Sequence, residues 1–165
     1  MTKSQLIVAL RRTILIILIV LLIPHYIQKL TNDRDRGMGD TIYTLKDDGP
    51  VSKLPVHQSF KIDNDTVTVD TVYVTPKQIM VTYTYRTKQT KNVWSFPDMS
   101  LVLVMPDGQR LMSHNAGSNG TSWGSYSYVS FDLPDSMTDH ADLVYDRYDR
   151  HAELQIPLSK AGDGL

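Results

Sequence analysis

The sequence predicts a mainly β protein in which an N-terminal transmembrane helix is followed by an antiparallel immunoglobulin-like β-sandwich. Three observations carry this prediction: an apolar run at residues 13–23, alternating apolar and polar residues from about His57 onward, and an unusual set of acidic residues. Of the 18 acidic residues, all but one, Glu153, are Asp. Because Glu favours helices whereas Asp gathers at turns and helix caps, this ratio indicates a body rich in strands and loops.

The apolar run has the sequence TILIILIVLLI and contains no polar residue after Thr13, so it lacks the polar stripe of a surface helix. Its length also suits the centre of a cleavable signal peptide, but no A-x-A-like site follows it. Extending the helix to Leu30 gives a length of about 27 Å, close to the roughly 30 Å of a hydrocarbon core. We therefore predict an uncleaved signal anchor at residues 13–30, with the lipid bilayer as its partner. A cleaved signal peptide and a buried core helix are the alternatives.

Flanking length and composition predict how the rest of the chain is organised. A short cytoplasmic tail at residues 1–12 precedes the anchor, so the long C-terminal part is expected on the extracytoplasmic side of the cell membrane. Residues 31–55 mix charge with Gly and Pro, which predicts an irregular tether whose apolar island, residues 42–45, docks as an edge strand. The β-sandwich is expected at residues 56–159, with a disordered tail at residues 160–165.

The N-terminal third of the chain has a positive net charge, and the rest has a negative one. Residues 1–54 carry eight Lys/Arg and five Asp, a net charge of +3, and residues 55–165 carry nine against thirteen acidic residues, a net charge of −4. A mildly acidic exported body argues against nucleic acid as a partner. The chain contains no Cys, which fits a bacterial exported protein that needs no disulfide.

Alternation with a period of two predicts seven to nine short strands. The clearest is residues 79–85, where four apolar or aromatic residues alternate with Met80 and two threonines. Because the strands alternate, each sheet has one solvated face and the sheets are antiparallel, which favours two sheets packed as an immunoglobulin-like sandwich. A closed barrel with a similar number of strands is the alternative. The other strands are expected near residues 60–62, 67–69, 93–96, 101–105, 109–112, 125–133, 143–145 and 152–158.

Three segments of the body have a layout of short strands and turns that resembles a known kind of domain. They are KIDNDTVTVDTVYVTPKQIMVTYTYRT, VWSFPDMSLVLVMPDGQRL and FDLPDSMTDHADLVYD, within residues 57–158. This layout resembles the uncharacterised immunoglobulin-like extracytoplasmic domains of Gram-positive (Firmicutes) membrane proteins, of the kind appended to anti-sigma-factor-like proteins. The resemblance implies an extracytoplasmic module behind a single transmembrane helix. It does not imply sigma-factor inhibition, because that requires a cytoplasmic domain and only about twelve residues precede the anchor.

No motif in the sequence carries catalytic chemistry. No two histidines have H-x-x-x-H spacing, and neither a G-x-S-x-G elbow nor a Gly-rich phosphate loop is present. His140 and His151 each have acidic neighbours that would suit a metal site, but the simpler interpretation is a solvated acidic loop. We predict that the protein is not an enzyme and holds no metal and no cofactor.

One stretch, residues 115–128, has the composition of a recognition loop: NAGSNGTSWGSYSY. Rigid amphipathic rings among small hydrogen-bonding residues are typical of antibody paratopes. The stretch therefore favours a binding module. For an exported module on a membrane anchor, the expected partner is a protein of an envelope-signalling or secretion system. The alternative is a cell-wall glycan-binding module in which exposed rings stack on sugars. The simpler interpretation is a long hairpin loop before a strand whose tyrosines face partly into the core. The predicted ligand-binding residues are Trp94, Asn119, Trp123, Tyr126 and Tyr128.

Overall fold

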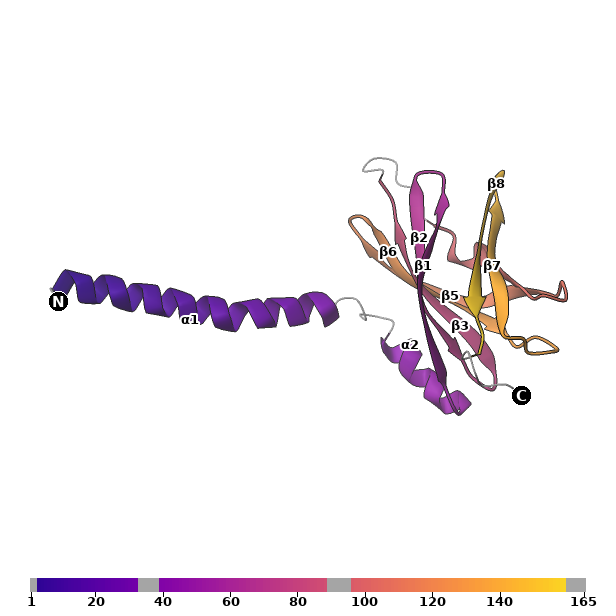
Figure 1. Ribbon diagram of the computed structural model, residues 1–165, viewed down its shortest axis with the longest axis horizontal. Helices are drawn as coiled ribbons and strands as arrows, with labels where there is room; N and C mark the ends of the chain where they lie inside the picture. Colours follow the sequence, from indigo (N-terminus) through magenta and orange to yellow (C-terminus); the bar gives the residue numbers. More distant parts are fainter. Residues whose placement is uncertain (1–2, 33–38, 89–95, 160–165) are drawn as a thin grey trace. The chain divides into compact units, whose positions relative to one another are not determined.

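The computed structural model of the chain describes residues 3–32, 39–88 and 96–159. The chain divides into two compact units, Met1–Arg36 and Gly37–Leu165. Figure 1 shows both units and labels most of their helices and strands. The helices are α1 (Lys3–Asn32), α2 (Gly39–Thr44), η1 (Leu45–Asp48) and η2 (Asp98–Ser100), and the strands are β1 (Ser52–Ile62), β2 (Asp65–Val74), β3 (Gln78–Arg86), β4 (Leu101–Val104), β5 (Arg110–Thr121), β6 (Gly124–Asp132), β7 (His140–Arg147) and β8 (Arg150–Pro157).

The first unit contains the single long helix α1, which carries the apolar run. The ten large apolar side chains at residues 14–23 are all exposed, from 47% for Leu18 to 66% for Leu21. In the part of the chain that the structure describes, no helix combines the length and the apolar character needed to cross a membrane. The transmembrane helix predicted at residues 13–30 is therefore not confirmed.

The second unit is built around one antiparallel sheet of eight strands in the order β1-β2-β3-β6-β5-β4-β7-β8 (Figure 1). In β8, exposed residues alternate with more buried ones because one face of the strand packs on the core while the other meets solvent. In β3, by contrast, every residue from Ile79 to Tyr85 is buried. The prediction of a mainly β, antiparallel body is confirmed.

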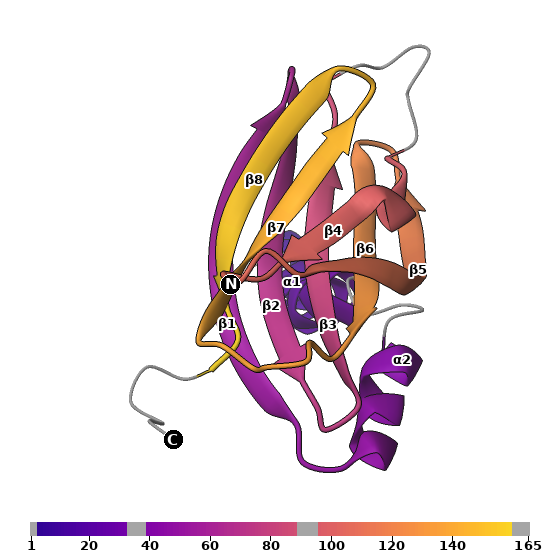
Figure 2. The ribbon, with the colours of Figure 1, turned by 90° about the vertical axis from the view of Figure 1, so that its right-hand side faces the viewer.

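Strand β5 connects two halves of this sheet. Residues 110–112 pair with β4, whereas residues 113–121 pair with β6, and the register shifts between Ser113 and Asn115. A bulge of this kind bends a strand and increases its twist. The sheet therefore bends at β5, between the part that pairs with β4 and the part that pairs with β6. Figure 2 shows β7 and β8 crossing in front of β1 and β2. The core between the two halves includes the fully buried side chains of Leu103, Phe131, Leu143 and Ile156.

The strand order differs from that of an immunoglobulin domain. In an immunoglobulin domain the second and third strands lie in different sheets, whereas here β2 and β3 form a hairpin in one sheet, with Val74 opposite Ile79. The meander β4-β5-β6 with β3 beside β6 is a Greek key. The immunoglobulin-like connectivity is therefore not observed, although two packed antiparallel layers are compatible with a β-sandwich. The first and last strands of the sheet, β1 and β8, lie close together. Within the described ranges, no ladder of backbone hydrogen bonds joins them.

The apolar island at residues 42–45 forms helical turns, so the prediction of an edge strand is wrong there. Ile42 and Leu45 are three residues apart, and a helical turn places such residues on one face. Together with Val51 they pack on Tyr73 and Met80, and Leu45 is only 2% exposed. This satellite core covers one end of the sheet face that points away from the main core.

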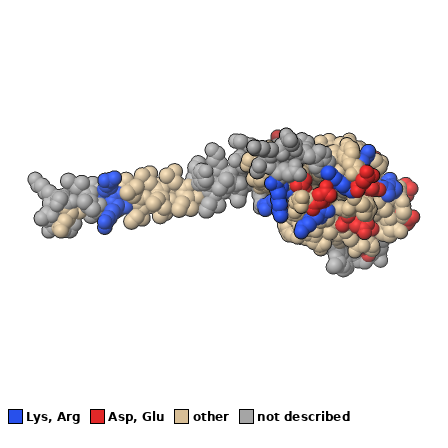
Figure 3. Space-filling view, turned by 90° about the horizontal axis from the view of Figure 1, so that it is seen from above, with Lys and Arg blue, Asp and Glu red and all other residues tan. Residues whose placement is uncertain are grey.

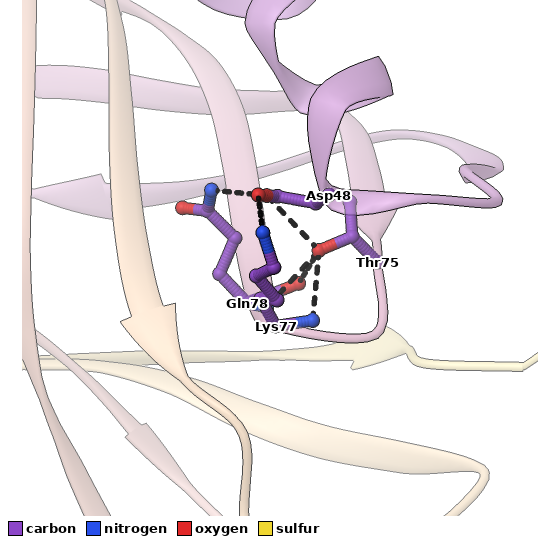
Figure 4. Close-up of polar contacts among 4 residues, drawn as sticks. All are labelled: Asp48, Thr75, Lys77 and Gln78. Atoms are coloured by element: carbon purple, nitrogen blue, oxygen red, sulfur yellow. Dashed lines mark hydrogen bonds and ion pairs between the residues drawn. The ribbon is translucent and has the colours of Figure 1, made fainter.

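Asp48 ties η1 to the turn between β2 and β3 (Figure 4). Its carboxylate accepts hydrogen bonds from Gln78 Nε2 at 2.6 Å and Thr75 Oγ1 at 3.4 Å. It also lies 3.3 Å from Lys77 Nζ. The hydrogen bond from Gln78, followed by the contacts with Lys77 and Thr75, holds the pKa of Asp48 below its ordinary value of 3.8 against an opposing effect of desolvation.

We expect the docking of η1 to weaken in acid. Because the pKa of Asp48 is lower in the folded protein, its stabilising contribution is present above its ordinary pKa of 3.8 and is lost as the pH falls through the lowered value. Amide exchange protection of η1, compared between neutral and acidic pH, measures this loss. Asp48→Asn is expected to remove the protection at neutral pH, whereas Asp47→Asn, at an exposed neighbour in the same helix, is expected to leave it unchanged. Equal effects of the two variants would contradict the role of Asp48.

Candidate recognition surface

Residues 115–128, whose simpler interpretation was a long hairpin loop, lie almost entirely in strands. β5 and β6 pair from Asn115 opposite Ser130 to Thr121 opposite Gly124. Only residues 122–123 remain as the turn between them. The stretch is therefore a paired β-hairpin rather than a loop.

Gly117 fits into β5 because an aromatic ring covers it. It lies opposite Tyr128, and a Cβ atom at Gly117 would lie 2.5 Å from Cε1 of that ring. A ring over a glycine in a strand restores packing that the glycine cannot provide. Tyr128 also packs against the satellite core around Leu45 and Met80. The structure therefore gives Tyr128, a predicted ligand-binding residue, a packing role.

Arg86, Trp123 and Tyr126 gather at the turn end of the hairpin, and we call these three residues the hairpin cluster. The rings of Trp123 and Tyr126 meet edge to face, with centroids 5.2 Å apart at an interplanar angle of 87°. The guanidinium carbon of Arg86 lies 5.1 Å from the centroid of the Trp123 ring. Edge-to-face and cation–π contacts of this kind hold the three side chains in one arrangement.

The backbone at the turn fixes the position of Trp123. The Thr87 amide donates to the Trp123 carbonyl at 3.0 Å, and the Trp123 amide donates to Thr121 Oγ1 at 3.4 Å. Thr121 Oγ1 donates in turn to the Gly124 carbonyl at 3.1 Å. Gly124 has a φ of +153°, and a Cβ there would lie 1.9 Å from the carbonyl oxygen of Tyr85. The close approach of the turn to β3 therefore requires glycine.

Asn119 joins this surface from β5. It lies opposite Tyr126 and shares its face of the sheet, and it is half-buried. Asn119, Trp123 and Tyr126 are thus three predicted residues that the fold brings together, whereas Trp94 lies outside the described residues. Sequence reasoning missed Arg86, which reaches Trp123 only because β3 pairs with β6 and Arg86 lies opposite Gly124. The one available signal was that Arg86 directly follows the clearest predicted strand, residues 79–85.

Short hydroxyl side chains line the sheet beside the hairpin cluster. Thr84, opposite Tyr126, donates to Asp70 Oδ2 at 2.8 Å, and Thr82 donates to the Thr71 carbonyl at 3.1 Å. Both threonines are about 95% buried because the longer side chains around them cover them. Next to the hairpin cluster, the accessible chemistry therefore comes from the rings and the guanidinium group rather than from the hydroxyls of Thr82 and Thr84.

Some of the charged groups on the second unit form small, separate pairs. Figure 3 shows acidic and basic side chains interspersed on the visible face of this unit. His114 lies 3.4 Å from Asp132, and His151 lies 3.6 Å from Glu153. Within residues 3–32, 39–88 and 96–159, no three His, Cys, Asp or Glu side chains are arranged so that they could share a metal ion.

Comparison with known proteins adds no family to this description. No protein-family model, no curated protein and no solved structure matches the chain. The resemblance to extracytoplasmic domains of Gram-positive membrane proteins therefore stays a prediction. A functional assignment depends on the geometry of the hairpin cluster and on the exposed apolar helix.

Proposed function

We propose that this chain is a membrane-attached binding module, rather than an enzyme, that engages a partner protein through the hairpin cluster. The observation that carries the proposal is the mutual contact of Arg86, Trp123 and Tyr126 at the end of a paired β-hairpin. Trp, Tyr and Arg are the residue types that contribute most to binding energy at protein interfaces. Side chains held in place before binding lose less conformational freedom when a partner arrives.

The geometry favours a protein partner over a cell-wall glycan. A sugar ring stacks on an open aromatic face, whereas one face of the Trp123 ring already carries the guanidinium group of Arg86. The second ring of the cluster, Tyr126, meets Trp123 at its edge and so does not extend a flat stacking platform. A mixed cationic and aromatic surface suits the carboxylate, carbonyl and aromatic groups of a protein partner.

Membrane attachment is supported by the ten exposed apolar side chains at residues 14–23. Apolar surface of this extent marks a binding site for a membrane or a protein. At 1.5 Å per residue the run alone is about 15 Å long, but α1 continues beyond it. Residues 13–30 together are about 27 Å long, close to a hydrocarbon core of about 30 Å. We therefore retain residues 13–30 as the proposed single-pass anchor, with the second unit on the extracytoplasmic side as an accessory of envelope signalling or secretion.

Binding through the hairpin cluster is tested with the full chain immobilised in detergent. We expect the wild type to capture a protein from the solubilised envelope of the source cell, with an affinity that Trp123→Ala and Arg86→Ala each lower about thirtyfold, since an interface hot spot contributes about 2 kcal/mol. Lys61→Ala is the matched control, because Lys61 is an exposed cation on the same face of the sheet, two strands away.

The same preparation is applied to purified peptidoglycan. Little retention is expected. Strong retention of the wild type that Trp123→Ala abolishes would contradict the proposal and support the glycan-binding alternative. An affinity for the captured protein that falls equally in all three variants would also contradict it, because the loss would then not depend on the hairpin cluster.

A further inference from the structure

Residues 39–48, which we call the docked segment, comprise α2 and η1 and lie on the sheet face that points away from the main core. Leu45, which is 2% exposed, packs in the satellite core, and Asp48 accepts hydrogen bonds from Thr75 and Gln78. Helices of six and four residues are too short to be stable by themselves in water. The helical form of the docked segment therefore depends on its contacts with the sheet.

Tyr128 connects the docked segment to the β5–β6 hairpin. Its half-buried ring packs against the satellite core to which Leu45 belongs. The same ring covers Gly117, since a Cβ atom there would lie 2.5 Å from Cε1 and 2.9 Å from both Cζ and the hydroxyl oxygen of Tyr128. One aromatic side chain therefore contacts both the core of the docked segment and the backbone of β5.

The hairpin cluster begins at the next residue pair on the same face of these strands. Tyr126 lies two residues from Tyr128 in β6, so both side chains point to one face of the sheet. In the ladder between β5 and β6, Gly117 lies opposite Tyr128 and Asn119 lies opposite Tyr126. A displacement of the Tyr128 ring from Gly117 therefore disturbs the strand pairing that also holds Tyr126.

We propose that the docked segment positions the hairpin cluster through Tyr128, so that the cluster binds its partner with full affinity only while residues 39–48 are docked. This inference rests on the proposed binding function and adds its regulation. Because such coupling is reciprocal, binding of the partner at the hairpin stabilises the docked segment by the same factor. Only residues 33–38 separate α1 from the docked segment in the chain, so tension in this connection reaches the docked segment before it reaches the sheet.

Amide hydrogen exchange of the full chain in detergent tests the coupling without a partner. Leu45→Asp places a carboxylate at a buried position and is expected to release the segment. We expect exchange to rise about tenfold in residues 39–48 and in residues 117–124, but not in β7 and β8. Tyr43→Asp, at a 67% exposed position of the same segment, is the matched control and should change neither region. A rise confined to residues 39–48 would overturn the proposal.

Two further variants make the exchange test specific. Asp48→Asn removes the polar contacts and leaves Leu45 in place, so it releases the segment more mildly and decides the question if Leu45→Asp also raises exchange in β7 and β8. Tyr128→Ala tests the route. If Tyr128 carries the coupling, Tyr128→Ala alone raises exchange in residues 117–124, and adding Leu45→Asp raises it no further. Additive effects of the two substitutions would overturn the proposal.

Affinity for the protein captured from the solubilised envelope separates this inference from the proposed function. We expect Leu45→Asp to lower that affinity about fivefold and Tyr43→Asp to leave it unchanged. An affinity that falls with Trp123→Ala but not with Leu45→Asp would overturn the coupling alone. An affinity insensitive to Trp123→Ala would overturn the proposed function, whereas the exchange measurements would still decide whether the docked segment positions the hairpin.

Discussion

Replacing Phe96 by Ala is expected to lower the free energy of unfolding by about 3–5 kcal/mol. Phe96 is 7% exposed and lies among three tyrosine rings, with centroids 5.2 Å from Tyr85, 5.6 Å from Tyr145 and 5.7 Å from Tyr83. These rings come from both halves of the sheet, β3 and β7. Removing the central ring therefore leaves a cavity where the two layers meet, and the aromatic contacts are lost in addition to the burial of apolar surface. Urea titration of the full chain in detergent measures the change.

Two of the three surrounding tyrosines are held by carboxylates, so they are poorly able to fill that cavity. Tyr83 donates to Asp98, and Tyr85 donates to Asp65 Oδ2 at 2.6 Å. Desolvation, together with the neighbouring carboxylates, raises the pKa of both phenols above their ordinary value of 10, so they remain donors at neutral pH. Phe96→Leu, which keeps most of the volume, is the control and is expected to cost about 1.5 kcal/mol. Equal losses for Ala and Leu would contradict a cavity as the cause.

Replacing Gly124 by Ala is expected to lower the free energy of unfolding by about 3 kcal/mol and to weaken partner binding as well. The new Cβ would lie 1.9 Å from the Tyr85 carbonyl oxygen and 2.9 Å from its carbon, at a φ of +153°. Backbone atoms cannot rotate away as a side chain does, so β3 and β6 must separate locally. That separation moves Trp123 away from Arg86 and disperses the hairpin cluster.

Gly120→Ala is the matched control for Gly124→Ala. Gly120 lies in the same hairpin, but a Cβ there meets no atom within 4 Å. We expect its effect on stability to stay within about 0.5 kcal/mol. If the two alanine variants lose equal stability in urea titrations, general strand weakening rather than contact with the Tyr85 carbonyl is responsible.

The strands were predictable from sequence where the residues that face the main core are apolar or aromatic at every second position. In β3 these are Ile79, Val81, Tyr83 and Tyr85, and the structure pairs this whole segment with β2 and β6. The second half of β5 was not predictable in the same way, because Gly, Ser and Asn are also the residues of loops. Its strand structure depends on pairing with β6 and on the Tyr128 ring over Gly117, which are contacts between separate segments.

Two further features depend on information that periodicity does not contain. The short island from Ile42 to Leu45 is compatible with a strand and with a helical turn, and packing on Tyr73 and Met80 decides between them. Strand order likewise follows from the connections in space, so an alternating pattern predicts antiparallel layers without giving their connectivity. The hairpin cluster shows the same limit, since Arg86 and Trp123 meet only through the pairing of β3 with β6.

Flotation of the full chain with vesicles of phosphatidylethanolamine and phosphatidylglycerol tests membrane attachment most directly. We expect the wild type to rise with the vesicles in a density gradient. A variant with both Ile17→Asp and Leu21→Asp should remain at the bottom, because each Asp at the centre of a membrane helix costs about 3 kcal/mol. Tyr43→Asp, at a 67% exposed position of the second unit, is the control and should rise like the wild type. A wild type that stays at the bottom, or a double variant that rises equally, would contradict the account.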